Sequence, residues 1–228
     1  MFMNNYKAAL GVLAKKPMML WGLSLLMGIL TIVASFATAT IPFLSIAIGY
    51  LFACGSVKLY MDGLKGKEVN SKQLFAAFNK DAIKTAGAMA WKDLWTLIWS
   101  AVPIYGTVKA YSYRFVPYIV MTRPEISAFD ALKLSMKLTN GKKLHMWLAD
   151  IVFVIAPGVA MGILLGLSAI PVLGILFSLA LAVLVLALLL FSNIFVGLYS
   201  AAFFSEEELD AAIAEMNAAE AVEETEAV

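Results

Sequence analysis

The chain has 228 residues, of which 62% are hydrophobic and only 14% charged, and its mean hydropathy is +0.85. These values exclude an ordinary soluble domain and predict an all-α membrane protein with one domain in the bilayer. The net charge of +1 is unevenly distributed: residues 205–228 hold nine of the sixteen acids and no base, whereas residues 1–204 carry seventeen bases against seven acids, or +10. We therefore expect a basic membrane domain (1–204) and an acidic tail (205–228).

Residues 2–16 place apolar side chains at helical spacing with lysines between them, which predicts a helix on the membrane surface. The first span follows from Met18 to Thr40 and the second from Pro42 to Met61. Both are long enough to cross a ~30 Å hydrocarbon layer at about 1.5 Å per residue. The first is too long for a cleaved signal peptide, and the second follows it almost at once. The lone cysteine, Cys54, should lie near mid-bilayer and permits neither an intramolecular disulfide nor a cysteine metal site.

Two more surface helices are expected, at 71–84 with Ser71 as N-cap and at 127–140 with Ser127 as N-cap and Asn140-Gly141 as the stop. Pro117 should kink the fourth span. The last four spans run from Thr85 to Val102, from Gly106 to Thr122, from Leu144 to Leu167 and from Val172 to about Phe195, and the last helix continues past the lipid.

The chain therefore reads as six transmembrane helices in three proline-turn hairpins, each preceded by a cytoplasmic amphipathic helix. The turns at Pro42, Pro103 and Pro171 contain no Lys or Arg, whereas the N-terminal segment and the two long loops contain most of the seventeen bases. By the positive-inside rule, both termini and the long loops are cytoplasmic and the proline turns are outside. This predicts a multi-pass membrane protein with both termini in the cytoplasm.

The turns also resemble one another in sequence. Residues 101–106 and 169–174 share A-x-P-x-x-G, and residues 40–45 have the same shape. One interpretation is a threefold internal repeat with a period of roughly 60 to 70 residues. The alternative is that any tight turn at a membrane surface favours proline and glycine.

Residues 95–143 resemble an uncharacterised family of bacterial integral membrane proteins, classed as a domain of unknown function. The shared features are Leu94-Trp95, the turn Pro103 to Gly106, Lys109 to Tyr113, Arg123-Pro124-Glu125, Ser135-Met136, Gly141 to Lys143 and the aromatic pair Phe203-Phe204. This chain departs from the family pattern in having Ile104-Tyr105 where glycine commonly follows the proline. The resemblance implies a multi-spanning bacterial membrane protein and supplies neither an activity nor a ligand.

A candidate polar site lies in the hairpin of residues 91–125, because charged residues inside a span usually face the bundle interior and have partners. Its members are Lys92, Asp93, Lys109, Tyr111, Tyr113, Arg114 and Asp150. Asp93 lies ten residues before Pro103 and Arg114 eleven after it, so we expect them at equal depth and paired. The alternatives are that Arg114 snorkels and Asp93 is protonated, or that Lys92 satisfies Asp93 locally.

Other residues have plainer interpretations. Asp150 is about two turns into the fifth span and either reaches the interface or belongs to the site. His145 is read as interfacial, and Asn193 as bonded to another helix. Trp91, Trp95 and Trp99 form an aromatic stripe that either packs on a helix or stacks a substrate. The hydroxyls of Tyr111 and Tyr113 either line a polar cavity or bond a carbonyl freed by Pro117.

No catalytic, phosphate-binding or dinucleotide-binding motif is present, so we expect no enzyme, cofactor, metal site or nucleic-acid partner. The favoured function is a non-catalytic accessory or assembly protein that binds anionic lipid at its basic inner surface. Its acidic tail should begin as a helix capped by Ser205, end in disorder, and meet either a partner protein or the chain's own basic loops. The alternative is a transporter or channel-like protein, which would function as a homodimer. An intramembrane enzyme using Asp93, Asp150 and His145 ranks last.

Overall fold

The computed structural model describes residues 2–15, 17–38, 41–79, 81–151, 155–171 and 173–226. These residues form helices, turns and no strand, which confirms the predicted all-α class for the described chain. The helices are α1 (Phe2–Ala14), α2 (Met18–Ala37), α3 (Pro42–Leu64), α4 (Ser71–Leu74), α5 (Ala82–Ser100), α6 (Pro103–Ser112), α7 (Val116–Thr122), α8 (Ala128–Leu138), α9 (Lys143–Asp150), α10 (Ala156–Leu167), α11 (Gly174–Ala201) and α12 (Glu206–Glu226).

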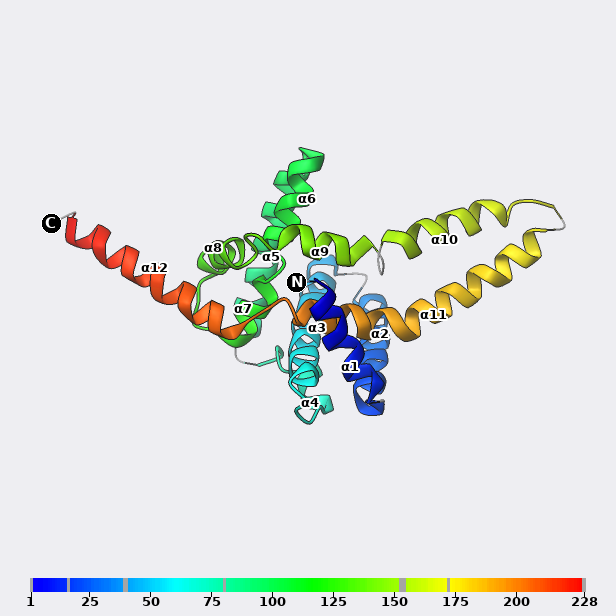
Figure 1. Cartoon of the computed structure of the whole chain (residues 1–228), viewed down its shortest axis with the longest axis horizontal. Helices are drawn as coiled ribbons and strands as arrows, with labels where there is room; N and C mark the ends of the chain where they lie inside the picture. Colours follow the sequence, from blue (N-terminus) through cyan, green and yellow to red (C-terminus); the bar gives the residue numbers. More distant parts are fainter. Residues whose placement is uncertain are drawn as a thin grey trace.

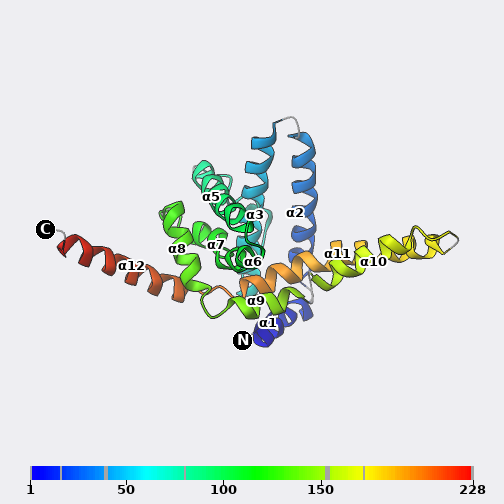
Figure 2. The same cartoon turned by 90° about the horizontal axis from the view of Figure 1, so that it is seen from above.

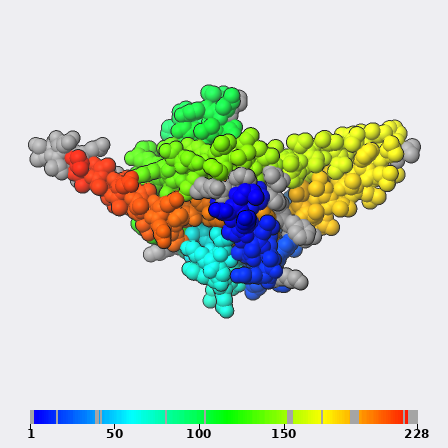
Figure 3. Space-filling view, in the orientation of Figure 1, coloured from blue at the N-terminus to red at the C-terminus, as the bar shows by residue number. Residues whose placement is uncertain are grey.

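Three helical hairpins extend from a common body: α2–α3, α5–α6 and α10–α11. Figure 1 shows the α5–α6 and α10–α11 hairpins pointing in different directions, and Figure 2 shows α2 and α3 side by side along a third. The hairpins therefore diverge and do not form one parallel bundle. In the space-filling view (Figure 3), α10–α11 and α12 project at opposite ends of an elongated molecule.

The similarity of the three proline turns extends to their structure. In each turn, the residue three positions after the proline donates its backbone N–H to the carbonyl of the residue before the proline. The bonds are Ser45 to Ile41 (3.1 Å), Gly106 to Val102 (2.7 Å) and Gly174 to Ile170 (2.7 Å). Glycine is required for a close approach in two of them: a Cβ at Gly106 would lie 2.8 Å from Ser100 Cα, and one at Gly174 would collide with the Ser168 carbonyl oxygen.

Two of the described helices, Met18–Ala37 and Phe43–Leu64, are long and apolar enough to cross a membrane. They correspond to the first two predicted spans. The segments Ala156–Leu167 and Gly174–Leu188 are apolar but shorter. None of the residues of α10 is buried in the molecule.

The predicted surface helices have different outcomes. Residues 2–14 are helical, but α1 lies against α9 and α11, where Tyr6 donates to the Ala149 carbonyl at 2.7 Å. The helix expected over 71–84 is wrong in extent, because α4 is a single turn and α5 already begins at Ala82. Its N-cap is Asn70, which forms a capping box with Gln73.

The helix predicted over 127–140 is found as α8, with its predicted caps. The Ser127 hydroxyl accepts the Asp130 N–H at 3.1 Å, and Gly141 has φ +74°, a left-handed conformation that suits glycine after a helix end. Leu132 and Leu138 of this helix are buried, whereas Phe129 is exposed.

The last three predicted spans have different outcomes. The fourth is not one kinked helix, because α6 ends at Ser112 and α7 starts at Val116. Pro117 is in the first turn of α7, where its missing N–H and fixed φ suit a helix start. The fifth predicted span contains α9 and α10, and residues 152–154 between them are outside the described part. The sixth, α11, continues through Ala201 as expected.

The acidic tail begins as a helix, as expected, and α12 extends over Glu206–Glu226; the disorder of its distal end stays a prediction. Ser205 accepts the Glu208 N–H at 3.3 Å, which confirms it as the capping residue. The helix packs against α8. Leu209 and Ala212 are buried there, so the first part of the tail belongs to the folded body.

Candidate functional site

Side chains at the C-terminal end of α8 stabilise the interruption between α6 and α7. Ser135 donates its hydroxyl to the Ser112 carbonyl at 2.7 Å and accepts the Phe115 N–H at 3.1 Å. Thr139 donates to the same carbonyl at 3.3 Å. Backbone groups freed by a break must find partners when they are buried, and Ser135 supplies one to each side. The break is therefore stabilised by specific hydrogen bonds, and it places Arg114 in the turn between α6 and α7.

Arg114 reaches across this turn to Asp150 at the end of α9. Its Nη1 and Nη2 donate to the two carboxylate oxygens at 2.6 and 3.1 Å, and Nη2 also donates to the Ser200 hydroxyl at 3.0 Å. Tyr111 donates to Asp150 at 2.9 Å, and Tyr199 donates to its other oxygen. With these four bonds, the carboxylate uses all of its accepting positions within the protein.

The N-terminal helix α1 packs against this cluster. Tyr6 stacks on Tyr199 with ring centroids 5.6 Å apart. Burial, and next the negative charge of Asp150, raise the pKa of the Tyr6 hydroxyl to about 12. Tyr6 therefore stays a neutral donor at ordinary pH. The cluster joins α1, α6, the break, α9 and α11, so it connects segments that are far apart in the sequence.

The predicted Asp93–Arg114 pair is wrong. Arg114 takes Asp150 as its carboxylate, whereas Asp93 binds Lys92 at 2.7 Å and accepts the Tyr50 hydroxyl at 2.6 Å. The alternative in which Lys92 satisfies Asp93 is the one found. Equal distance from a proline turn did not place the two groups together, because the break in the second arm changes its direction and turns Arg114 towards α9.

Lys109 is held by aromatic rings. Its Nζ lies 5.1 Å from the ring centroid of Trp99, 5.5 Å from that of Tyr105 and 5.9 Å from that of Tyr113. It also lies 3.6 Å from the Met136 sulfur. Ring faces attract a cation, so this cage stabilises the ammonium group.

The Trp99 indole completes the cage by donating to the Tyr113 hydroxyl at 3.1 Å. Trp91, Trp95 and Trp99 form the predicted stripe, with neighbouring ring centroids 5.9 and 6.4 Å apart. The stripe therefore packs within the molecule and supplies one wall of the Lys109 cage.

The seven candidate residues thus fall into three groups, and the structure does not bring them into one site. Lys92 and Asp93 form the first, Lys109 and Tyr113 the second, and Tyr111, Arg114 and Asp150 the third. The sequence reasoning missed Tyr50, Ser135, Tyr199 and Ser200. Ser135 had a signal in the family resemblance, while the other three are single polar residues within apolar helices and become informative only through their contacts.

A cavity of about 740 Å³ lies elsewhere, between α2, α3, α10 and α11. Its walls are mainly apolar and include Gly28, Gly49, Gly158 and Gly197. None of the seven candidate residues lines it. Among the described residues, no group of three or more His, Cys, Asp or Glu could hold a metal ion. The side chain of Asn193 is outside the described part of the structure.

No protein-family model, curated protein or solved structure matches this chain. The resemblance to the uncharacterised bacterial family therefore remains a prediction from residues 95–143. Within that stretch, Ser135 holds the helix break, Gly141 ends α8 with a positive φ, and Lys109 occupies the aromatic cage. The residues that carry the resemblance therefore have structural roles in and near the α6–α7 break.

Proposed function

We propose that the chain is a non-catalytic accessory or assembly protein of the bacterial cytoplasmic membrane whose basic inner surface binds anionic lipid. The observation that carries this proposal is the separation of its intramembrane charges into three groups, each satisfied by its own neighbours. A transport or catalytic site needs polar groups that converge on a shared space with bonding capacity left for a ligand. Asp150, with four internal donors, has little such capacity.

The proposal includes six crossings in three hairpins, with both termini cytoplasmic. Two membrane-length helices and the absence of Lys and Arg from the proline turns support it. It requires the three hairpins to align in a bilayer, whereas they diverge in Figure 1. The resemblance to a multi-spanning bacterial family supports the same topology.

The lipid preference of the purified protein tests this function. After extraction in a mild detergent, the protein should retain phosphatidylglycerol in preference to phosphatidylethanolamine, measured by mass spectrometry of the bound lipid. Changing the exposed residues Lys7, Lys15 and Lys72 to Gln should reduce the retained phosphatidylglycerol, because each basic residue near the surface attracts anionic headgroups. Equal retention of the two lipids would overturn the proposal.

A transporter is the second candidate, and the α6–α7 break favours it. Discontinuous helices in membrane proteins often surround a substrate or ion site, and here the break carries Arg114. Proteoliposomes decide between the two functions. Protein-dependent flux of protons, sodium or potassium that disappears in a folded Arg114→Gln/Asp150→Asn protein would establish transport, whereas the accessory function predicts no flux above that of empty liposomes.

A further inference from the structure

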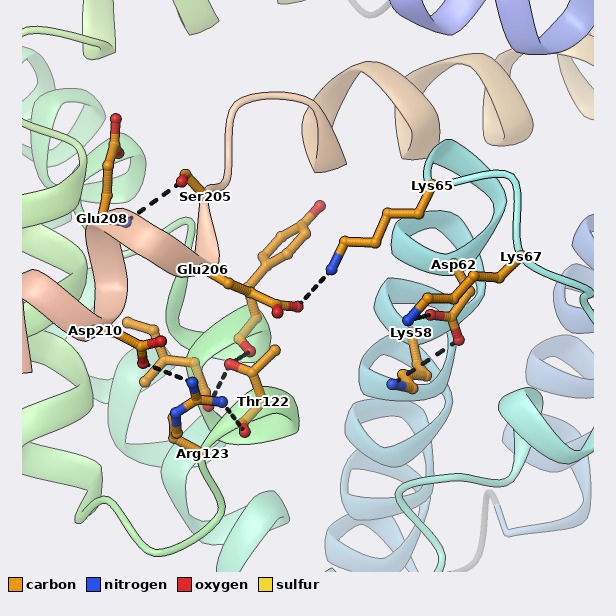
Figure 4. Close-up of polar contacts among 12 residues, drawn as sticks. Lys58, Asp62, Lys65, Lys67, Thr122, Arg123, Ser205, Glu206, Glu208 and Asp210 are labelled. Carbon is orange, nitrogen blue, oxygen red and sulfur yellow. Dashed lines mark hydrogen bonds and ion pairs between the residues drawn. The ribbon is translucent and has the colours of Figure 1, made fainter.

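The acidic helix α12 contacts four basic residues that come from different parts of the chain: Lys65, Arg123, Lys137 and Lys142. We call these four residues the tail-docking surface. Each of them forms an ion pair with a different tail carboxylate, as Figure 4 shows for Lys65 and Arg123. The pairs are Lys65–Glu206 (2.8 Å), Arg123–Asp210 (2.6 Å), Lys137–Glu215 and Lys142–Glu208.

The contacts of the described side chains place the first half of the tail in this docking. Leu209 and Ala212 are buried, and Ile213 and Met216 pack against the core. These positions recur at helical spacing, so they form one apolar stripe between the carboxylates. Residues 217–219 are exposed. The tail therefore consists of a docked segment, residues 205–216, and a distal segment that extends away from the body (Figure 1).

In the proposed six-span topology, the tail-docking surface lies at the level of the lipid headgroups. Lys65 directly follows Phe43–Leu64, one of the two helices long enough to cross a membrane. Arg123 directly follows α7, and Lys142 directly precedes α9. Basic residues at the ends of apolar segments are those that contact the anionic headgroups of the inner leaflet. The docked carboxylates thus occupy positions that lipid phosphates would otherwise fill.

Lys142 makes simple release of the tail unfavourable. It is only 8% exposed, and its ammonium group contacts Glu208, the Phe203 carbonyl at 3.3 Å and the Phe115 ring at 5.9 Å from its centroid. Loss of Glu208 would leave a largely buried cation without its carboxylate, which is costly. The tail should therefore be exchanged for another anion and not merely detach.

We propose that anionic phospholipid headgroups and the docked segment of α12 compete for the tail-docking surface. The docked segment occupies the tail-docking surface when no lipid is bound there. Lipid binding at this surface releases the tail. This inference rests on the proposed function, in which the basic inner face binds anionic lipid. It goes further by naming the residues that bind and the segment that excludes the lipid.

The test measures the exposure of the docked segment in two lipid surroundings. The full chain carrying Ala212→Cys is placed in nanodiscs of phosphatidylcholine or of an equal mixture with phosphatidylglycerol, and its labelling by a membrane-impermeant maleimide is timed. The buried Cys54 supplies the background rate. We expect labelling at least about tenfold faster with phosphatidylglycerol, because four ion pairs are exchanged for lipid contacts. Ala218→Cys, exposed on the same helix, should label equally fast in both.

Two matched variants separate specific pairing from total charge. Glu206→Gln, Glu208→Gln, Asp210→Asn and Glu215→Gln together should make Ala212→Cys label rapidly in both lipids. Removing the same number of charges from the distal segment, with Glu220, Glu223, Glu224 and Glu226 changed to Gln, should preserve the lipid dependence. Hydrogen exchange of residues 205–216 in the unlabelled chain gives the same comparison without a cysteine in the interface.

The outcomes distinguish this inference from the proposed function. If phosphatidylglycerol is retained preferentially but Ala212→Cys labels at equal rates in the two lipids, the competition is wrong and the lipid-binding function stands. If neither assay shows a preference for anionic lipid, the proposed function fails and the competition fails with it. An equal lipid dependence in the four-residue variant and in wild type would also overturn the competition.

Discussion

Arg114 and Asp150 form a bidentate salt bridge that joins the α6–α7 break to the end of α9, with Nη1 and Nη2 of the guanidinium group donating to the two carboxylate oxygens. Their side chains are only 21% and 13% exposed. Removing one partner from such a pair leaves the other charge buried without compensation, whereas removing both leaves none.

Either Arg114→Gln or Asp150→Asn alone should therefore lower the free energy of unfolding by about 3 kcal/mol, and the double variant should recover part of that loss. The measurement is the SDS unfolding curve of the purified protein in detergent micelles. Lys92→Gln and Asp93→Asn are the matched control, because this pair is 22% and 44% exposed and should contribute about 1 kcal/mol or less. Additive losses in the Arg114 and Asp150 variants would contradict the cluster described above.

Ser135→Ala should destabilise the break itself. The change removes the partner of the Ser112 carbonyl and of the Phe115 N–H, so we expect a loss of about 1 to 3 kcal/mol in the same unfolding assay. Ser35→Ala is the control, since that exposed hydroxyl bonds the Thr31 carbonyl of its own helix and its loss should change stability by less than about 0.5 kcal/mol. Similar losses for both variants would mean that Ser135 does not hold the break.

Alanine substitutions at two glycines should have opposite effects. A Cβ at Gly106 would meet the backbone of Ser100 and Trp99 at 2.8 Å, so Gly106→Ala should cost about 1 to 3 kcal/mol. At Gly87 in α5, no atom lies within 4 Å of the added Cβ, and alanine should stabilise the helix by about 0.5 to 1 kcal/mol. Thermal unfolding midpoints check both, and a stabilising Gly106→Ala would rule out the close approach in this turn.

The proposed topology predicts three distinct labelling patterns with a membrane-impermeant maleimide. Cys54, which is fully buried, should resist the reagent in intact and in permeabilised cells. In a chain carrying Tyr105→Cys, this exposed position in the first turn of α6 should react in intact cells. The loop residue changed in Lys67→Cys should react only after permeabilisation, because basic loops stay in the cytoplasm. Reaction of Lys67→Cys in intact cells would reverse the orientation.

Local sequence determined those features that depend on a single segment. The apolar runs predicted α2 and α3, and the capping residues Ser127, Gly141 and Ser205 ended or began helices as expected, because caps satisfy backbone groups within a few residues. The charge distribution also separated the basic body from the acidic tail. These properties require no knowledge of what packs against the segment.

Tertiary structure alone decided which polar groups meet. Depth in a hairpin suggested Asp93 as the partner of Arg114, but the break that Ser135 stabilises turns Arg114 towards Asp150, which lies 36 residues later. Likewise, composition alone did not choose between a partner protein and the chain's own loops for the acidic tail. The apolar stripe at Leu209 and Ala212 fits against α8 and places the carboxylates beside Lys65, Arg123, Lys137 and Lys142. Such pairings depend on the relative placement of distant helices, and residue spacing in one segment carries no information about it.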